Sequence, residues 1–123
     1  MKISIHYIEK PSALRSGRLA KLRQNKSYLV IEFDAAEEAV VFPENKVDLI
    51  IVGHDLADED MSGADLVADL CDDASGNLIL FLGMRDEVLK DIDNERIFFL
   101  SEDAGPHLVD SMVKRILKKK CYN

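Results

Sequence analysis

The sequence VDLIIVGHDLADEDMSGADLVADL occupies residues 47–70 and changes character twice along its length. Residues 47–52 are almost continuously apolar, as in a parallel strand that is covered on both faces. Residues 53–62 are polar and acidic, as in a surface loop. From Leu66 to Cys71, apolar side chains then recur at i, i+1, i+4 and i+5, which indicates one buried face of a helix. The segment therefore predicts a strand, a loop and a helix in succession.

The same alternation extends over the rest of the chain. Strands are predicted around Ile3 and Ile5 and over residues 28–33, 47–52, 78–82 and 97–100. Helices are predicted from Ser12 to about Gln24, from Asp34 to Pro43, after Ser62, from Val88 to Ile92 and from Pro106 onward. This order predicts a single α/β domain over residues 1–123, with a doubly wound five-stranded parallel sheet between two helical layers. In such sheets, chemistry lies beyond the carboxyl ends of the strands, so the residues after each strand are the candidate site.

The composition is that of a soluble globular domain, with 47% hydrophobic and 32% charged residues in 123. No apolar run approaches the roughly 20 residues that cross a bilayer, and the first ten residues lack the apolar centre of a secretory signal. We therefore expect a cytoplasmic chain that does not bind membranes. Cys71 and Cys121 form no Cys-x-x-Cys pair, so neither a metal site nor a redox motif is expected.

Residues 47–70 resemble the centre of a response-regulator receiver domain, in which an Asp-Leu-apolar strand ends at the phosphoacceptor and a Met-Ser-Gly type of turn begins the next helix. The resemblance covers the whole chain and implies a flavodoxin-like, receiver-like α/β/α fold. In that family, two acids after the first strand and the acceptor bind Mg²⁺. A hydroxyl after the fourth strand and a lysine after the fifth bind the phosphoryl oxygens.

Most of the positions that the family uses carry unsuitable residues here. The acid pair falls on Tyr7 and Ile8 with Glu9 nearby, the hydroxyl position on Gly83, and the lysine position on Ser101 or Glu102. An apolar side chain cannot bind a hard cation, and neither Ser101 nor Glu102 supplies the missing positive charge. The resemblance therefore implies a receiver whose phosphorylation site is degenerate.

Two registers are open for the acceptor itself. Counting forward from Asp48 along the strand places Gly53 there, whereas counting back from Gly63 places Asp55 there. The unbroken strand favours Gly53, which has no side chain to phosphorylate. His6 and His54 are expected near the ends of neighbouring strands, at a crevice that Tyr7, Glu9, His54 and Asp55 could line together. No recurring metal-ligand spacing is found among them.

Charge is distributed unevenly along the chain. The net charge is +6 over residues 1–26, −18 over residues 27–113 and +5 over residues 114–123, which together give −7. In the family fold, the first and last helices share one face of the sheet, so the two basic ends should form one surface. The residues expected to bind a partner there are Arg15, Arg18, Lys114 and Lys118. Such a surface suits an acidic protein, a histidine kinase or another signalling protein, and is compatible with a homodimer; nucleic acid is disfavoured by the acidic total.

The leading hypothesis is a pseudo-receiver that signals by protein–protein interaction without phosphorylation, is not an enzyme and needs no cofactor. The alternative is a functional receiver that is phosphorylated at Asp55 with Mg²⁺. A third hypothesis is a flavin- or nucleotide-binding protein of similar fold. It is disfavoured because residues 6–11, which follow the first strand, contain no glycine to approach a phosphate.

Overall fold

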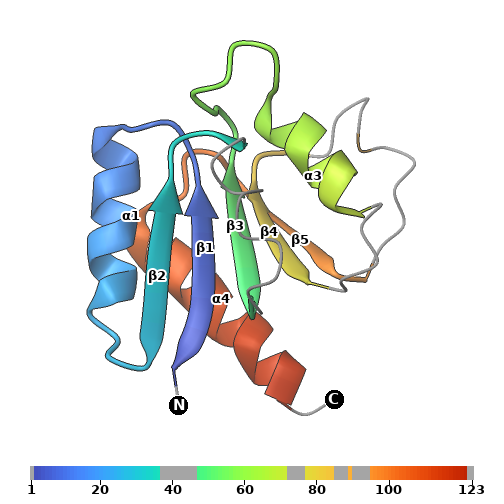
Figure 1. The fold of residues 1–123 in the computed structure, drawn as a ribbon. Coiled ribbons are helices and arrows are strands. Elements are labelled where there is room, and N and C mark those ends of the chain that lie inside the picture. The colour runs from blue at the N-terminus through green and yellow to red at the C-terminus, as the bar shows by residue number, and fades with distance from the viewer. Residues whose placement is uncertain (1, 37–46, 72–76, 85–88, 90–94, 122–123) are drawn as a thin grey trace.

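Five parallel strands form one sheet in the order β2-β1-β3-β4-β5 (Figure 1). They are β1 (Ile3–Ile8), β2 (Tyr28–Phe33), β3 (Leu49–Gly53), β4 (Leu78–Leu82) and β5 (Ile97–Leu100). The structure is a computed structural model, which describes residues 2–36, 47–71, 77–84, 89 and 95–121. The predicted doubly wound parallel sheet is confirmed, and its strand order reverses between β1 and β3. The carboxyl ends of these two strands therefore border the crevice where such folds place their sites.

The described helices lie on both faces of the sheet, with α1 (Ala13–Arg23) and α4 (Pro106–Cys121) on one face and α3 (Gly63–Cys71) on the other (Figure 1). The helices predicted after Asp34 and from Val88 to Ile92 lie mostly outside the described residues. Among the helices that the structure describes, none has the length and hydrophobicity needed to span a bilayer.

Alternate side chains of the strands pack into two separate apolar cores, one on each face of the sheet. Ile5 and Tyr7 of β1 are completely buried in the core beneath α1 and α4, whereas Ile8 belongs to the core beneath α3. All residues of β3 are buried, as its continuous apolar sequence predicted for a central strand. The sheet is thus rigidly packed on both sides close to the crevice.

Local capping explains where the helices begin. Ser12 Oγ accepts a hydrogen bond of 3.0 Å from the Arg15 amide, and Pro106 occupies the first position of α4. A β-carbon on Gly17 would lie 3.2 Å from Pro106 Cγ, so α1 and the start of α4 pack side by side. This contact places the first turns of both helices next to the strand ends.

Candidate functional site

The residue that ends β3 lies directly beneath the side chain of Glu9. A β-carbon on Gly53 would overlap Glu9 Cγ, Cδ and Oε2. The Glu9 carboxylate therefore fills the space that an acceptor side chain at Gly53 would need. Asp55, the alternative acceptor, lies two residues beyond the strand, and its side chain is 71% exposed.

A buried arginine neutralises this carboxylate. Arg18 of α1 is 0% exposed, and its Nη1 lies 3.3 Å from Glu9 Oε1 and 3.4 Å from Glu9 Oε2. The Tyr7 hydroxyl donates a hydrogen bond of 2.7 Å to Glu9 Oε1. Burial, reinforced by the Glu9 charge, raises the pKa of Tyr7 well above its ordinary value, so the phenol stays protonated and remains a donor.

The same guanidinium also binds the segment after β5. Arg18 Nε donates to the carbonyl of Ala104 at 2.9 Å, and Nη2 donates to the carbonyl of Glu102 at 2.6 Å. Ser101 Oγ is occupied within this segment, where it accepts from the Asp103 amide at 3.2 Å. We define the strand-tip network as Tyr7, Glu9, Arg18 and these two carbonyl groups. It ties β1 and α1 to the β5–α4 connection through one buried cation.

A second arginine of α1 is committed in a similar way. Arg15 is 7% exposed and contacts Glu32 Oε2 at 2.6 Å and Asp34 Oδ1 at 2.7 Å, and its Nη1 also donates to the Glu9 carbonyl. Burial lowers the pKa of Arg15, but the two carboxylates outweigh burial and the pKa is raised overall. Arg15 therefore connects α1 to the end of β2 rather than to solvent.

These contacts correct the predicted partner surface. Arg15 and Arg18 were expected to face a partner, but both are buried and satisfied by groups of this chain. Lys114 and Lys118 are exposed, and Lys114 Nζ lies 3.0 Å from Asp110 Oδ2. The cationic residues thus divide into an internal pair on α1 and an external set on α4.

The other sequence-predicted positions lie around the network without joining it. Ile8 is buried in the core beneath α3, and a β-carbon on Gly83 would lie 2.7 Å from the Phe81 ring. His54 Nδ1 lies 3.2 Å from Asp55 Oδ1 and 3.3 Å from Glu102 Oε2, with all three side chains at least half exposed. This exposed cluster links the β3–α3 and β5–α4 connections at the surface.

The structure does not bring the two candidate crevice histidines together. His6 lies inside β1 with Ile31 and Ile50 as its neighbours across the sheet, and its ring contacts that of Phe33 at 5.1 Å. Burial lowers the pKa of His6, so the neutral ring is favoured. His6 therefore does not lie at the strand-end crevice, because β1 continues to Ile8 beyond it.

The strand tips do not fit a divalent cation. Glu9 is the sole carboxylate of the strand-tip network, and its oxygens already accept from Tyr7 and Arg18. The guanidinium would repel Mg²⁺ from the same carboxylate, and Mg²⁺ requires nearly octahedral oxygen ligands. Within the described part of the chain, no three His, Cys, Asp or Glu side chains form a group that can bind a metal.

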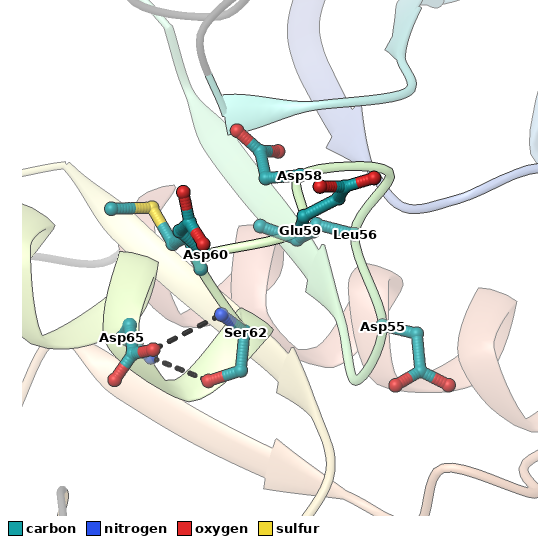
Figure 2. Close-up of a pocket in the computed structure, with 8 residues that line it drawn as sticks. Asp55, Leu56, Asp58, Glu59, Asp60, Ser62 and Asp65 are labelled. Atoms are coloured by element: carbon teal, nitrogen blue, oxygen red, sulfur yellow. Dashed lines mark hydrogen bonds between the residues drawn. The ribbon is translucent and has the colours of Figure 1, made fainter.

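An open acidic hollow of about 380 Å³ lies beside the network, in the β3–α3 loop (Figure 2). Its lining residues are Asp55, Leu56, Asp58, Glu59, Asp60, Met61, Ser62 and Asp65. Ser62 and Asp65 exchange hydrogen bonds of 3.0 and 3.2 Å that cap α3, and Asp58 Oδ1 accepts from the Ala36 amide at 2.8 Å. Figure 2 shows the Asp55 side chain pointing away from these acids. Three of the lining residues, Asp58, Ser62 and Asp65, are thus already engaged in hydrogen bonds that stabilise the loop and the start of α3.

Arg15 and Arg18 are the residues of the candidate site that the sequence analysis placed wrongly, although a signal for their burial was present. Arg15, Arg18, Leu19 and Leu22 follow the i, i+3, i+4, i+7 spacing of one helical face. All four are buried, so the two arginines lie on the apolar face of α1. The charge distribution along the chain predicted that both arginines are exposed, whereas their helical spacing predicts that they are buried.

The strand order, the three layers and the position of the crevice together define the fold of a response-regulator receiver domain. A signal receiver domain of an HD domain-containing protein from Pseudomonas fluorescens has 20% identity and a TM-score of 0.77, with all of both chains covered. The receiver domain of a signal transduction histidine kinase from Syntrophus aciditrophicus has 21% identity and a TM-score of 0.72, covering 94% of this chain and 90% of that one.

A response regulator receiver domain protein from Methanospirillum hungatei is also similar, with 16% identity, a TM-score of 0.72 and coverage of 97% and 96%. No protein-family model and no curated protein matches the sequence. At these identities, the structural similarity establishes the receiver fold.

Proposed function

We propose that this chain is a receiver-like module of two-component signalling that acts by binding a protein, without phosphorylation of its strand tips. The geometry at Gly53 carries the proposal. The position that ends β3 has no side chain, and the space above it is filled by Glu9. A phosphoryl group attached there would need both an acceptor and room, and neither is present.

The charge balance supports the same function. Phosphoryl transfer to a carboxylate needs cations that neutralise the incoming oxygens. Arg18 is a cation at the carboxyl ends of the strands, where a phosphoryl group would bind. Its donors, however, are directed to Glu9 and to the carbonyls of Glu102 and Ala104. Freeing it would leave Glu9 and these carbonyls without their partner. The network thus performs internally the bridging between strand ends that a bound phosphate and metal perform in an active receiver.

Incubation with acetyl phosphate and Mg²⁺, followed by mass spectrometry of the intact chain, tests this function. We expect no adduct with the mass of a phosphoryl group, under conditions that label a receiver with its full set of acids. An adduct that disappears in an Asp55→Asn variant would establish the competing function, a receiver phosphorylated in the β3–α3 loop. An adduct that disappears only in Glu9→Gln would also refute the proposal, since it would make the covering carboxylate the acceptor.

Beryllofluoride, which mimics the phosphoryl group, gives an independent measurement. Amide resonances of Gly53, Gly83 and Ala104, which lie at or after the ends of β3, β4 and β5, should not shift when beryllofluoride and Mg²⁺ are added, because Glu9 covers Gly53 and Arg18 binds the Ala104 carbonyl. Shifts that saturate at all three positions would mean that the network opens to admit the ligand, and would contradict the proposal.

A further inference from the structure

The outer surface of α4 carries four cationic side chains within fewer than two turns. They are Lys114, Arg115, Lys118 and Lys119, all exposed, and we call them the α4 basic face. Ile116 and Leu117, which lie between them in the sequence, are buried. Asp110 is the one acid between residues 106 and 119, and it pairs with Lys114. The outer half of this helix therefore has a strong positive charge.

Three of the four cations of this face differ in their contacts from Arg15 and Arg18 of α1. Arg15 and Arg18 contact carboxylates of this chain. Among the residues that the structure describes, Arg115 and Lys118 have no carboxylate within ion-pair distance, and neither does Lys119. These cations can therefore bind an external acid without first breaking an internal ion pair.

The stability of the helix itself does not account for this arrangement. Cations in the last turn of a helix interact favourably with its dipole, but the effect falls off within that turn. Arg115 lies six residues before the end of α4, at i,i+3 and i,i+4 spacing from Lys118 and Lys119. Like charges at these spacings destabilise a helix by about 0.2–0.5 kcal/mol per pair. The face thus carries a small energetic cost in the free protein, which an acidic partner would relieve.

We propose that the α4 basic face binds an acidic segment of a partner protein; this identifies the class of partner for the binding function proposed above. The two rows Lys114–Lys118 and Arg115–Lys119 each repeat after four residues, which is about 6 Å along a helix. A partner helix with Glu at i and i+4 presents carboxylates at the same interval. Several such pairs can form at once without bending either helix.

Other anions fit the face less well. None of the large apolar side chains that are exposed in the described residues is aromatic, so these side chains offer no stacking surface to the bases of a nucleic acid. An anionic membrane would need an apolar helix face to insert, but Ile116 and Leu117 are buried against the sheet.

Binding of a short synthetic helical peptide with Glu at i and i+4 on one face tests the assignment, measured by fluorescence anisotropy at low and physiological salt. Arg115→Glu should weaken binding about tenfold, which equals about 1.4 kcal/mol. Lys10→Glu is the matched control, because it changes the net charge by the same amount. Lys10 follows the carboxyl end of β1, at the opposite end of the strands from the last turn of α4. This variant should change binding by no more than about twofold, since salt screens charges beyond about 10 Å.

Thermal unfolding of Arg115→Glu provides the second readout. Its midpoint should equal or exceed that of the parent chain, because the introduced carboxylate would pair with Lys118 and Lys119 instead of repelling them. A lower midpoint would show that the charge serves the helix, and would overturn the proposal. So would equal losses of peptide binding in Arg115→Glu and Lys10→Glu.

Parallel titrations with a DNA duplex, with phosphatidylserine vesicles and with the unlabelled chain itself decide among the anions. Tighter binding of any of these than of the acidic peptide would overturn the assignment. The acetyl phosphate test uses the same preparations but a different readout. If the chain binds the peptide and also forms a phosphoryl adduct, only the proposed function is refuted. If it forms no adduct and does not bind the peptide, only the α4 assignment is refuted.

Discussion

Replacing Arg18 with methionine tests whether the strand-tip network stabilises the fold. Methionine keeps much of the apolar stem but removes the charge and the donors that reach Glu9, Glu102 and Ala104. Breaking a buried ion pair from one side costs about 3–5 kcal/mol, because the remaining charge is left without its partner. The Glu9 side chain is 13% exposed, so water can solvate it in part. We therefore expect the lower end of the range, about 3 kcal/mol.

Urea unfolding followed by circular dichroism measures this loss. With an m-value of about 2 kcal/mol/M, a loss of about 3 kcal/mol lowers the midpoint by about 1.5 M. Glu9→Gln alone should also cost about 3 kcal/mol, because the completely buried Arg18 loses its counter-charge although the amide oxygen still accepts from Tyr7. The double variant should then lose less than the sum of the two, by about 1–3 kcal/mol, as expected for residues in direct contact.

Arg23→Met is the matched control for Arg18→Met. Arg23 is on the same helix and lies 3.6 Å from Glu32 Oε1, but both side chains are more than 40% exposed, so its removal should cost less than about 1 kcal/mol. The reasoning is refuted if Arg18→Met costs no more than this control. It is refuted equally if the losses of Arg18→Met and Glu9→Gln are simply additive, because the two groups would then not be coupled.

Two further predictions concern glycine contacts and one concerns pH. Gly63→Ala should lower the free energy of unfolding by about 3 kcal/mol in urea titrations, because its β-carbon would overlap the backbone oxygen of Gly53, which cannot move without bending β3. Gly53→Ala should cost less, about 1–2 kcal/mol, and should speed amide exchange at Ala104, because the Glu9 side chain can turn away and release Arg18; unchanged exchange would contradict this. Burial lowers the pKa of His6 in the folded state, so its contribution is complete above about pH 6.5 and is lost as pH falls through the lowered value. Between about pH 7.5 and 5, stability should therefore fall more steeply in the parent chain than in His6→Phe, and equal slopes would exclude this role for His6.

Hydrophobic patterning was sufficient to predict the sheet. The continuous apolar sequence of β3 has few alternatives to a central parallel strand, because each of its residues must be buried. Ser12 and Pro106 likewise marked helix starts through local chemistry that does not depend on the rest of the fold. The end of β1 was less well defined, since His6 and Tyr7 are polar or half-polar, and strand pairing with β2 extends the strand to Ile8.

The interior of the site was harder to predict because it depends on contacts between residues that are far apart in the sequence. Gly53 was recognised as a position without a side chain, but no sequence pattern indicates that Glu9 fills the resulting space. Arg18 reaches carbonyl groups 84 and 86 residues away along the chain, and backbone carbonyls have no sequence signature. Charge counting therefore assigned Arg18 to the surface, where most arginines lie.

The strand-tip network also explains how the crevice of this receiver fold keeps a defined shape. An empty crevice lined by one carboxylate and several carbonyls would leave buried acceptors without donors. Arg18 supplies donors to Glu9, Glu102 and Ala104 together, and it comes from α1, whose partner helix α4 begins just after those carbonyls. Movement of the β5–α4 connection would therefore break contacts to a fully buried cation. It follows that this connection is fixed relative to β1 by groups of the chain itself.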